Sequence, residues 1–139
     1  MESASPNILV DRIVDFANNA FAESNVEFRS PLNVDGLPGI IPGDTARNVL
    51  LIFKEAITNV LKHSGAATCT LSVTSVEEDV IVFSLIDDGH GIPVGEESEG
   101  YGMLNMRKRA RRIGARFDIH ATPGEGTSII LGIAAKRIS

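Results

Sequence analysis

Two extended segments separated by a very short acidic turn restrict the folds open to this chain of 139 residues. Residues 68–76 and 80–86 are rich in Val, Ile, Thr and Ser, and the turn between them predicts a hairpin. A second pair of extended segments, 116–121 and 127–134, is joined by a turn that contains Pro and Gly. Because hairpins pair their strands in antiparallel fashion, we expect a mostly antiparallel sheet.

Three further segments show the periodicity of amphipathic helices. Ser5 is a favourable N-cap, with Pro6 at the first helical position. Asp44 is expected to cap a second helix that runs to about His63. A third helix is expected over residues 103–113, where apolar residues recur on one side.

The order of these elements indicates the fold class. Residues 26–34 form one more extended segment, and the chain contains no internal repeat. Helices and hairpins are mixed, which is typical of an α/β sandwich. We predict a single domain over residues 1–139: a two-layer α/β sandwich with a mixed, mostly antiparallel sheet and helices on one face.

Composition excludes several classes of protein. The net charge of -5 argues against a nucleic-acid-binding domain, and Ala110 interrupts the one basic run, at 107–112. The single cysteine, Cys69, cannot form an internal disulfide and indicates a cytoplasmic location. No apolar run approaches the roughly 18 residues that cross a bilayer, so we expect no membrane contact by this domain. Whether a parent protein is membrane-anchored is left open.

Several common phosphate- and metal-binding motifs are missing from the sequence. It contains neither a P-loop, nor G-x-G-x-x-G, nor H-E-x-x-H. His63, His90 and His120 have no metal-ligand spacing to one another. The chemistry must therefore come from other residues.

One candidate element lies on the second predicted helix. Glu55 and Asn59 are four residues apart and share a helical face, where carboxylate and carboxamide can hold a hard cation. Lys62, one turn further on, can meet phosphate oxygens as a point charge. A solvated helix face explains the same residues equally well.

Two glycine-rich elements follow along the chain. DDGHG at 87–91 comes directly after an apolar strand, and its first acid can accept a hydrogen bond from an exocyclic amine. Taken alone, an ordinary acidic turn is the simpler explanation. GYG at 100–102 opens the third helix, whose N-terminal N–H groups favour phosphate, and GEGT at 124–127 leads into the last strand.

In order and spacing these elements resemble the GHKL ATPase superfamily, which includes DNA gyrase and histidine kinases. The strings EAITNVLKHSGA, DDGHGIP and GYGMLNMRKRARRIGA…TPGEGT look like the catalytic domain of sensor kinases that pair with helix-turn-helix response regulators. The resemblance covers nearly the whole chain. It implies the Bergerat fold, ATP and Mg²⁺ as cofactors, and protein histidine kinase activity.

The resemblance also implies roles for the residues on the second helix. Asn59 would be the Mg²⁺ ligand, and Glu55 would hold the water shell of the ion. These two are the candidate catalytic residues. Lys62 and His63 would face the phosphates.

The glycine-rich elements would form the rest of the nucleotide site. Asp87 would accept the adenine amino group with support from Thr127, and Gly89 and Gly91 would shape the adenine pocket. A lid over residues 92–99 would close over the phosphates. The remaining candidate nucleotide-binding residues are Ile92, Gly100, Tyr101, Gly102 and Met103.

An acceptor histidine is not evident in this sequence. None of the three histidines lies in a helical His-Asp or His-Glu context, so we expect a fragment without the phosphoacceptor domain. The resemblance implies that dimerisation domain and a response regulator as partners, and a chain that binds Mg-ATP without labelling itself. Two alternatives stay open: an anti-sigma-type serine kinase of the same superfamily, and a non-catalytic, nucleotide-gated binding module.

Overall fold

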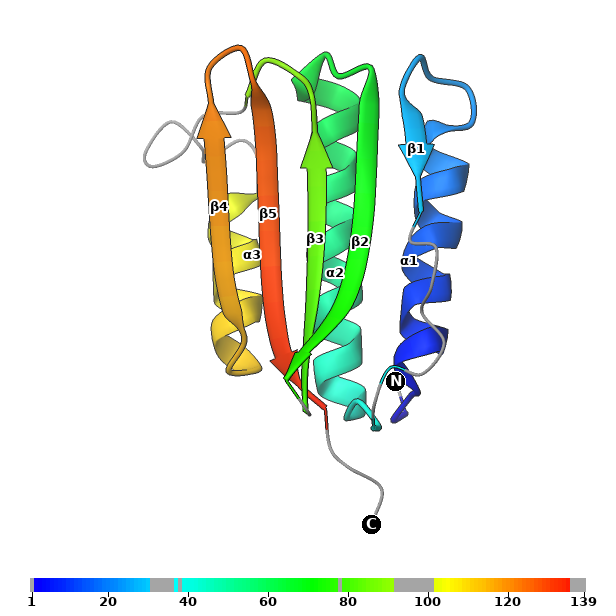
Figure 1. Ribbon diagram of the computed structural model, residues 1–139, viewed down its shortest axis with the longest axis vertical. Helices are drawn as coiled ribbons and strands as arrows, with labels where there is room; N and C mark the ends of the chain where they lie inside the picture. Colours follow the sequence, from blue (N-terminus) through cyan, green and yellow to red (C-terminus); the bar gives the residue numbers. More distant parts are fainter. Residues whose placement is uncertain (1, 31–36, 38, 78, 92–101, 136–139) are drawn as a thin grey trace.

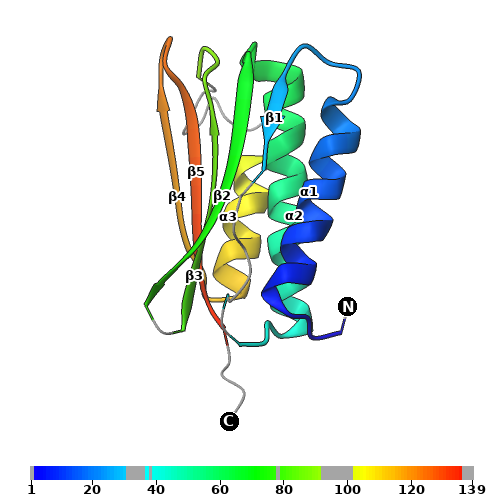
Figure 2. The same ribbon diagram turned by 45° about the vertical axis from the view of Figure 1, so that its right-hand side comes forward.

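The computed structural model describes residues 2–30, 37, 39–77, 79–91 and 102–135. These residues form two layers, a five-stranded sheet and helices that all lie on one of its faces (Figures 1 and 2). The helices are α1 (Pro6–Phe21), α2 (Gly43–Asn59) with its extension η1 (Val60–Ser64), and α3 (Met103–Arg112). The predicted two-layer α/β sandwich is confirmed.

The sheet has the order β1-β2-β3-β5-β4. Its strands are β1 (Glu27–Arg29), β2 (Thr68–Glu77), β3 (Val80–Asp87), β4 (Arg116–Thr122) and β5 (Gly126–Ala134). β1 pairs with β2 in parallel, and the other three pairings are antiparallel. Both predicted hairpins are present, so the sheet is mixed and mostly antiparallel. The predicted extended segment 26–34 is described only to residue 30 and gives the short strand β1.

The start of α1 is as predicted, but the start of α2 is not. Ser5 caps α1 by accepting a hydrogen bond from the backbone N–H of Ile8 at 3.4 Å. α2 begins at Gly43, and its N-cap position is Pro42, which makes no side-chain cap hydrogen bond. The prediction that Asp44 caps this helix is therefore wrong. Asp44 lies inside the first turn, where a carboxylate still favours the positive end of the helix dipole.

The C-terminal part of the second helix also differs from a regular α-helix. α2 ends at Asn59, and η1 continues it as a π-helical stretch up to Gly65, which has a left-handed backbone with φ of 64°. A π-helical turn contains more residues than an α-helical turn. As a result, the side chains of η1 do not follow the α-helical spacing that the sequence pattern predicts.

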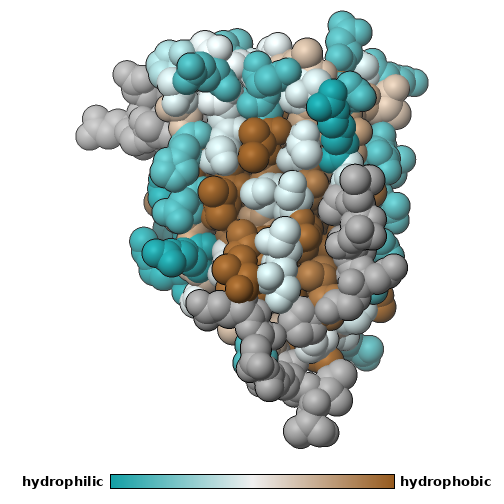
Figure 3. All heavy atoms as spheres, in the orientation of Figure 1, coloured by the Kyte–Doolittle hydropathy of each residue, from teal (hydrophilic) through white to brown (hydrophobic). Residues whose placement is uncertain are grey.

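The hydrophobic core lies between the sheet and the helices. Alternate residues of β3 and β5 point toward the helices, and Phe83 and Leu131 are fully buried. Phe53 of α2 packs against Phe83 with ring centroids 5.8 Å apart. The other face of the sheet, seen in Figure 3, carries apolar and neutral side chains. Within the described part of the chain, no helix combines the length and apolar character needed to span a bilayer.

Candidate functional site

The C-terminal ends of α2 and β3 and the start of β5 lie at the same end of the molecule (Figure 1). Asp87, the last residue of β3, is paired with Cys69 of β2 on one side and Thr127 of β5 on the other. All three residues are buried, with 4%, 0% and 5% of their surface exposed, respectively. The sheet therefore places a buried acid at the end of a central strand, as the sequence predicts.

Backbone donors hold the carboxylate of Asp87. Its Oδ1 accepts a hydrogen bond of 2.9 Å from the backbone N–H of Gly89, and the backbone N–H of Thr127 donates a second one. Burial raises the pKa of Asp87, while these two hydrogen bonds and the nearby His90 act in the opposite direction. A buried carboxylate in this fixed position is suited to accept a hydrogen bond from a ligand N–H group.

Two glycines allow the chain to approach this carboxylate closely. A Cβ atom at Gly89 would overlap the backbone carbonyl of Ser64, and one at Gly126 would overlap the carbonyl of Asp87. The same Ser64 carbonyl accepts a hydrogen bond of 2.9 Å from the N–H of His90. The DDGHG turn is thus fixed directly against the end of η1 and the start of β5.

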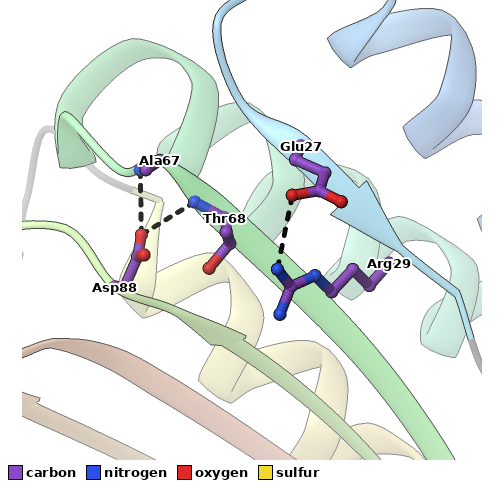
Figure 4. A network of polar contacts seen from close by, with 5 residues as sticks. All are labelled: Glu27, Arg29, Ala67, Thr68 and Asp88. Atoms are coloured by element: carbon purple, nitrogen blue, oxygen red, sulfur yellow. Dashed lines mark hydrogen bonds and ion pairs between the residues drawn. The ribbon is translucent and has the colours of Figure 1, made fainter.

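The second acid of the turn, Asp88, fixes the start of β2. Its Oδ1 accepts hydrogen bonds of 2.8 Å from the backbone N–H groups of both Ala67 and Thr68 (Figure 4). The hydrogen bond from Thr68 is the main reason that the pKa of this exposed carboxyl is lowered. The same view shows the exposed ion pair of Glu27 and Arg29 on β1, at 3.3 Å. The carboxylate of Asp88 therefore holds the backbone at the start of β2, whereas that of Asp87 accepts hydrogen bonds from other residues.

The polar residues of the second helix differ in how much of their surface is exposed. Asn59 is only 3% exposed, so a solvated helix face does not explain it. Glu55 is half-buried, and its carboxylate lies so close to Gly102 that a Cβ atom there would overlap it. Lys62 is exposed and His63 is half-buried. Asn59 and Glu55 are thus turned toward the protein, and Lys62 toward solvent.

The remaining predicted site residues are placed as follows. Gly91 has φ of 83°, a conformation that favours glycine. Met103 is buried at the start of α3. Ile92, Gly100 and Tyr101 lie outside the described residues, as does the predicted lid over residues 92–99.

A cavity of about 190 Å³ between α2 and α3 includes Glu55 in its lining, but not Asp87 or Asn59. In the part of the chain that the structure describes, no cluster of three or more His, Cys, Asp or Glu side chains could hold a metal ion. A cation here would depend on Asn59 and Glu55, which offer the hard oxygen donors that Mg²⁺ prefers. This donor set fits an ion that takes its other ligands from phosphates and water.

Ser64 is a site residue that the sequence motifs do not predict. This residue is completely buried, its Oγ donates to the carbonyl of Val60 at 2.7 Å, and it accepts from the N–H of Ala66 at 3.1 Å. The glycine that follows it was the available signal, because a left-handed Gly commonly ends a helix. The sequence predicts Gly126 only as part of the GEGT motif, whereas in the structure a Cβ atom at this position would overlap the carbonyl of Asp87.

The fold and this end of the sheet define an α/β-sandwich domain with a buried acid at the end of a central strand. The chain belongs to the family of histidine kinase-, DNA gyrase B- and HSP90-like ATPases, which matches residues 44–137. As a member of this family it binds ATP. The resemblance inferred from the sequence motifs is confirmed.

Curated relatives are sensor kinases. Sensor protein VraS of Staphylococcus epidermidis is 38% identical over 90 residues, which cover 64% of this chain and 26% of the relative. Sensor histidine kinase LnrJ of Bacillus subtilis is 35% identical over 127 residues, 90% of this chain and 30% of the relative. The chain thus spans between 26% and 30% of the length of these two relatives.

Solved structures with little sequence identity share the fold. The catalytic domain of histidine kinase ThkA has a TM-score of 0.75 at 15% identity, and the match covers 99% of this chain and 100% of that one. The mycobacterial sensor histidine kinase MprB has a TM-score of 0.72 at 15% identity, covering 99% of both chains. The architecture is therefore that of histidine kinase catalytic domains.

Proposed function

We propose that the chain is the ATP-binding catalytic domain of a two-component sensor histidine kinase. It transfers the γ-phosphoryl group of ATP to a histidine on a separate dimerisation domain, from which the group passes to a response regulator. The observation that carries this proposal is the buried Asp87 carboxylate, held by the N–H of Gly89 at 2.9 Å at the end of a central strand. The sensor kinases that match the chain support the choice of acceptor.

In this proposal Asp87 recognises adenine. Its carboxylate accepts a hydrogen bond from the exocyclic amino group, and Thr127, its neighbour on β5, supports that contact. Gly89 and Gly91 keep the turn narrow enough for the base to approach the backbone. A guanine base presents a carbonyl at this position and would leave the carboxylate facing another acceptor.

The triphosphate extends from adenine toward α2 and α3. Asn59 and Glu55 would hold Mg²⁺, which on binding neutralises negative charge on the phosphates. Lys62 and His63 face the phosphates from η1. The candidate residues that follow β3 in the sequence up to the start of α3 would complete the nucleotide site: Ile92, Gly100, Tyr101, Gly102 and Met103.

Transfer of the γ-phosphoryl group then depends on how ATP and the acceptor histidine are positioned relative to each other. A ring nitrogen of the acceptor histidine forms a bond to the γ-phosphorus while the bond to the bridging oxygen breaks, and ADP leaves with the electron pair. The domain contributes by holding ATP in line with that nitrogen and by stabilising charge. The base that receives the histidine proton is expected on the dimerisation domain, and we place the reaction in the cytoplasm.

The metal site is tested by calorimetric titration with ADP and a non-hydrolysable ATP analogue, with and without Mg²⁺. We expect Mg²⁺-dependent binding in the wild type that is lost in Asn59→Ala. Asn48→Ala is a matched control, because both asparagines lie on α2 and both are 3% exposed. Equal loss in both variants, with both folded by circular dichroism, would refute the role of Asn59.

The acceptor is tested by incubating the chain with radiolabelled ATP, alone and with a histidine-bearing dimerisation domain. We expect no label on the chain alone and acid-labile label on the added domain. Stable phosphohistidine on the isolated chain would contradict this assignment. Phosphoserine on a partner protein would instead support the serine-kinase alternative.

A further inference from the structure

Two adjoining cavities form a groove between α2 and α3, which we call the α2–α3 groove. The first, of about 190 Å³, is lined by α2 and by Asn105, Met106 and Arg109 of α3. The second, of about 250 Å³, shares Asn105 and Arg109 and adds Asn48, Lys108 and Arg112. The two cavities therefore adjoin along Asn105 and Arg109.

The α2–α3 groove is cationic in a chain whose net charge is -5. Lys54, Lys108, Arg109 and Arg112 line it, and among the described residues that line it Glu55 is the one acid. Arg112 also pairs with the exposed carboxylate of Asp44, with Nε and Oδ2 3.5 Å apart. Positive charge therefore outweighs negative charge among the described residues of the groove, although the chain as a whole is negative. Such a local potential attracts negatively charged partners and orients them.

One cation of the α2–α3 groove is held in place by a buried residue. The guanidinium of Arg109 donates to Oδ1 of Asn48 at 3.3 Å. Asn48 is itself 3% exposed, and its Nδ2 donates to the carbonyl of Asp44 at 2.8 Å. Because Asn48 is fixed, Arg109 presents its remaining N–H groups in a defined direction, which suits recognition of a planar carboxylate.

The α2–α3 groove lies next to the proposed phosphate end of the nucleotide site. Glu55 lines the groove and also contacts Gly102, which belongs to the proposed phosphate end of the nucleotide site. A chain segment bound in the groove therefore lies beside the group to be transferred. The acceptor protein is the partner that must reach this position.

We propose that the α2–α3 groove docks an acidic segment of the protein that receives the phosphoryl group. This inference rests on the proposed function. Acidic side chains of the segment pair with Lys108, Arg109 and Arg112, which positions the acceptor without contacting the nucleotide. A nucleic acid is the poorer occupant, because the field of a net-negative chain repels a long polyanion outside the groove.

The test uses two charge-matched double variants of α3. Lys108→Gln with Arg112→Gln removes two cations from the groove, whereas Arg107→Gln with Arg111→Gln removes two that line a different cavity, next to Phe117. In each double variant the two substituted residues are four apart on α3. The two variants therefore change the net charge by the same amount and have the same spacing along the helix. Binding is measured at low salt by the fluorescence anisotropy of a labelled ten-residue peptide of alternating Glu and Ala.

We expect the groove variant to bind the peptide about three- to tenfold more weakly than the control variant, which should resemble the wild type. Equal weakening in both variants, or no binding to the wild type, would overturn the proposal. So would preferential, groove-dependent binding of a short DNA duplex. An ADP titration of the same proteins separates the two claims, because nucleotide binding should be equal in all three whether or not the peptide binds.

Discussion

The backbone N–H of Gly89 donates a 2.9 Å hydrogen bond to the carboxylate of Asp87, two residues earlier in the chain. Asp87 is 4% exposed, so this bond fixes a buried charge that few water molecules can reach. A fixed acceptor of this kind discriminates strongly between ligands that donate a hydrogen bond and ligands that do not, since an unmatched buried group is costly.

Replacing Asp87 by Asn should weaken adenine nucleotide binding by about ten- to a hundredfold, because losing a charged hydrogen-bond partner costs roughly 1.5–3 kcal/mol. The measurement is calorimetric titration with ADP. Asp118→Asn on β4 is the control, because Asp118 is exposed on a different strand and the substitution removes the same charge. Similar affinities in all three proteins would show that Asp87 does not contact the base.

Nucleotide affinity should also depend on pH through Asp87. Burial raises the pKa of this carboxyl above its ordinary value, so the proton returns at a higher pH than for an exposed aspartic acid. The charged form accepts the hydrogen bond from adenine, so affinity should fall as pH is lowered through the raised pKa. ADP titrations across the acidic range should show this fall in the wild type and a flatter profile in Asp87→Asn.

The raised pKa of Asp87 affects the stability of the unliganded chain in the opposite direction from nucleotide affinity. Because the folded pKa of Asp87 lies above the unfolded one, its ionisation opposes folding at neutral pH. That unfavourable contribution decreases as pH falls through the folded pKa toward the unfolded value. Ligand binding and stability should therefore respond to acid in opposite directions at this residue, which distinguishes its effect from general acid denaturation.

The fold could be predicted from the sequence wherever local chemistry decides the structure. Short turns containing acids, Pro and Gly predict the two hairpins, and the four hairpin strands begin and end within one residue of the predicted bounds. In the predicted segment 26–34, in contrast, the described residues form a strand only at Glu27–Arg29. The start of α2 was missed because Asp44 is a good cap by residue type, but Pro42 and Gly43 already provide the turn into the helix. A choice between neighbouring cap positions depends on where the preceding loop is held.

The candidate site was predictable only as a set of motifs. The order of the motifs identified Asp87, whereas the contact of Ser64 with Gly89 depends on which segments meet in three dimensions. Helical periodicity placed Asn59 on a polar face, but it is buried in the folded chain. Burial of a single polar residue depends on neighbours distant in sequence, which periodicity does not report.

Asp88→Ala should loosen the start of β2 and leave nucleotide contacts in place. The substitution removes the acceptor of two 2.8 Å hydrogen bonds from the N–H groups of Ala67 and Thr68. The pKa of Asp88 is lowered by these bonds, so its contribution to stability is present at neutral pH and is lost as pH falls through the folded pKa. Hydrogen exchange at these two amides should accelerate in the variant at neutral pH, and unchanged exchange would contradict the assignment.

A pair of glycines in one turn tests the close packing around Asp87. Gly124 and Gly126 have positive φ values of 80° and 100°, so alanine is strained at both positions. Nothing lies within 4 Å of a Cβ atom at Gly124, whereas one at Gly126 would overlap the carbonyl of Asp87. Gly124→Ala should therefore cost about 1–2 kcal/mol of the free energy of unfolding, which is the strain alone.

Gly126→Ala should cost more, on the order of 3 kcal/mol or above, because the strand start must move away from Asp87. It should also weaken ADP binding, since the carboxylate moves with its own backbone, while Gly124→Ala leaves binding unchanged. Urea denaturation and calorimetry on the two variants measure both effects. Equal destabilisation would mean that the contact between Gly126 and Asp87 relaxes at no cost, and the turn would then not hold the carboxylate in place.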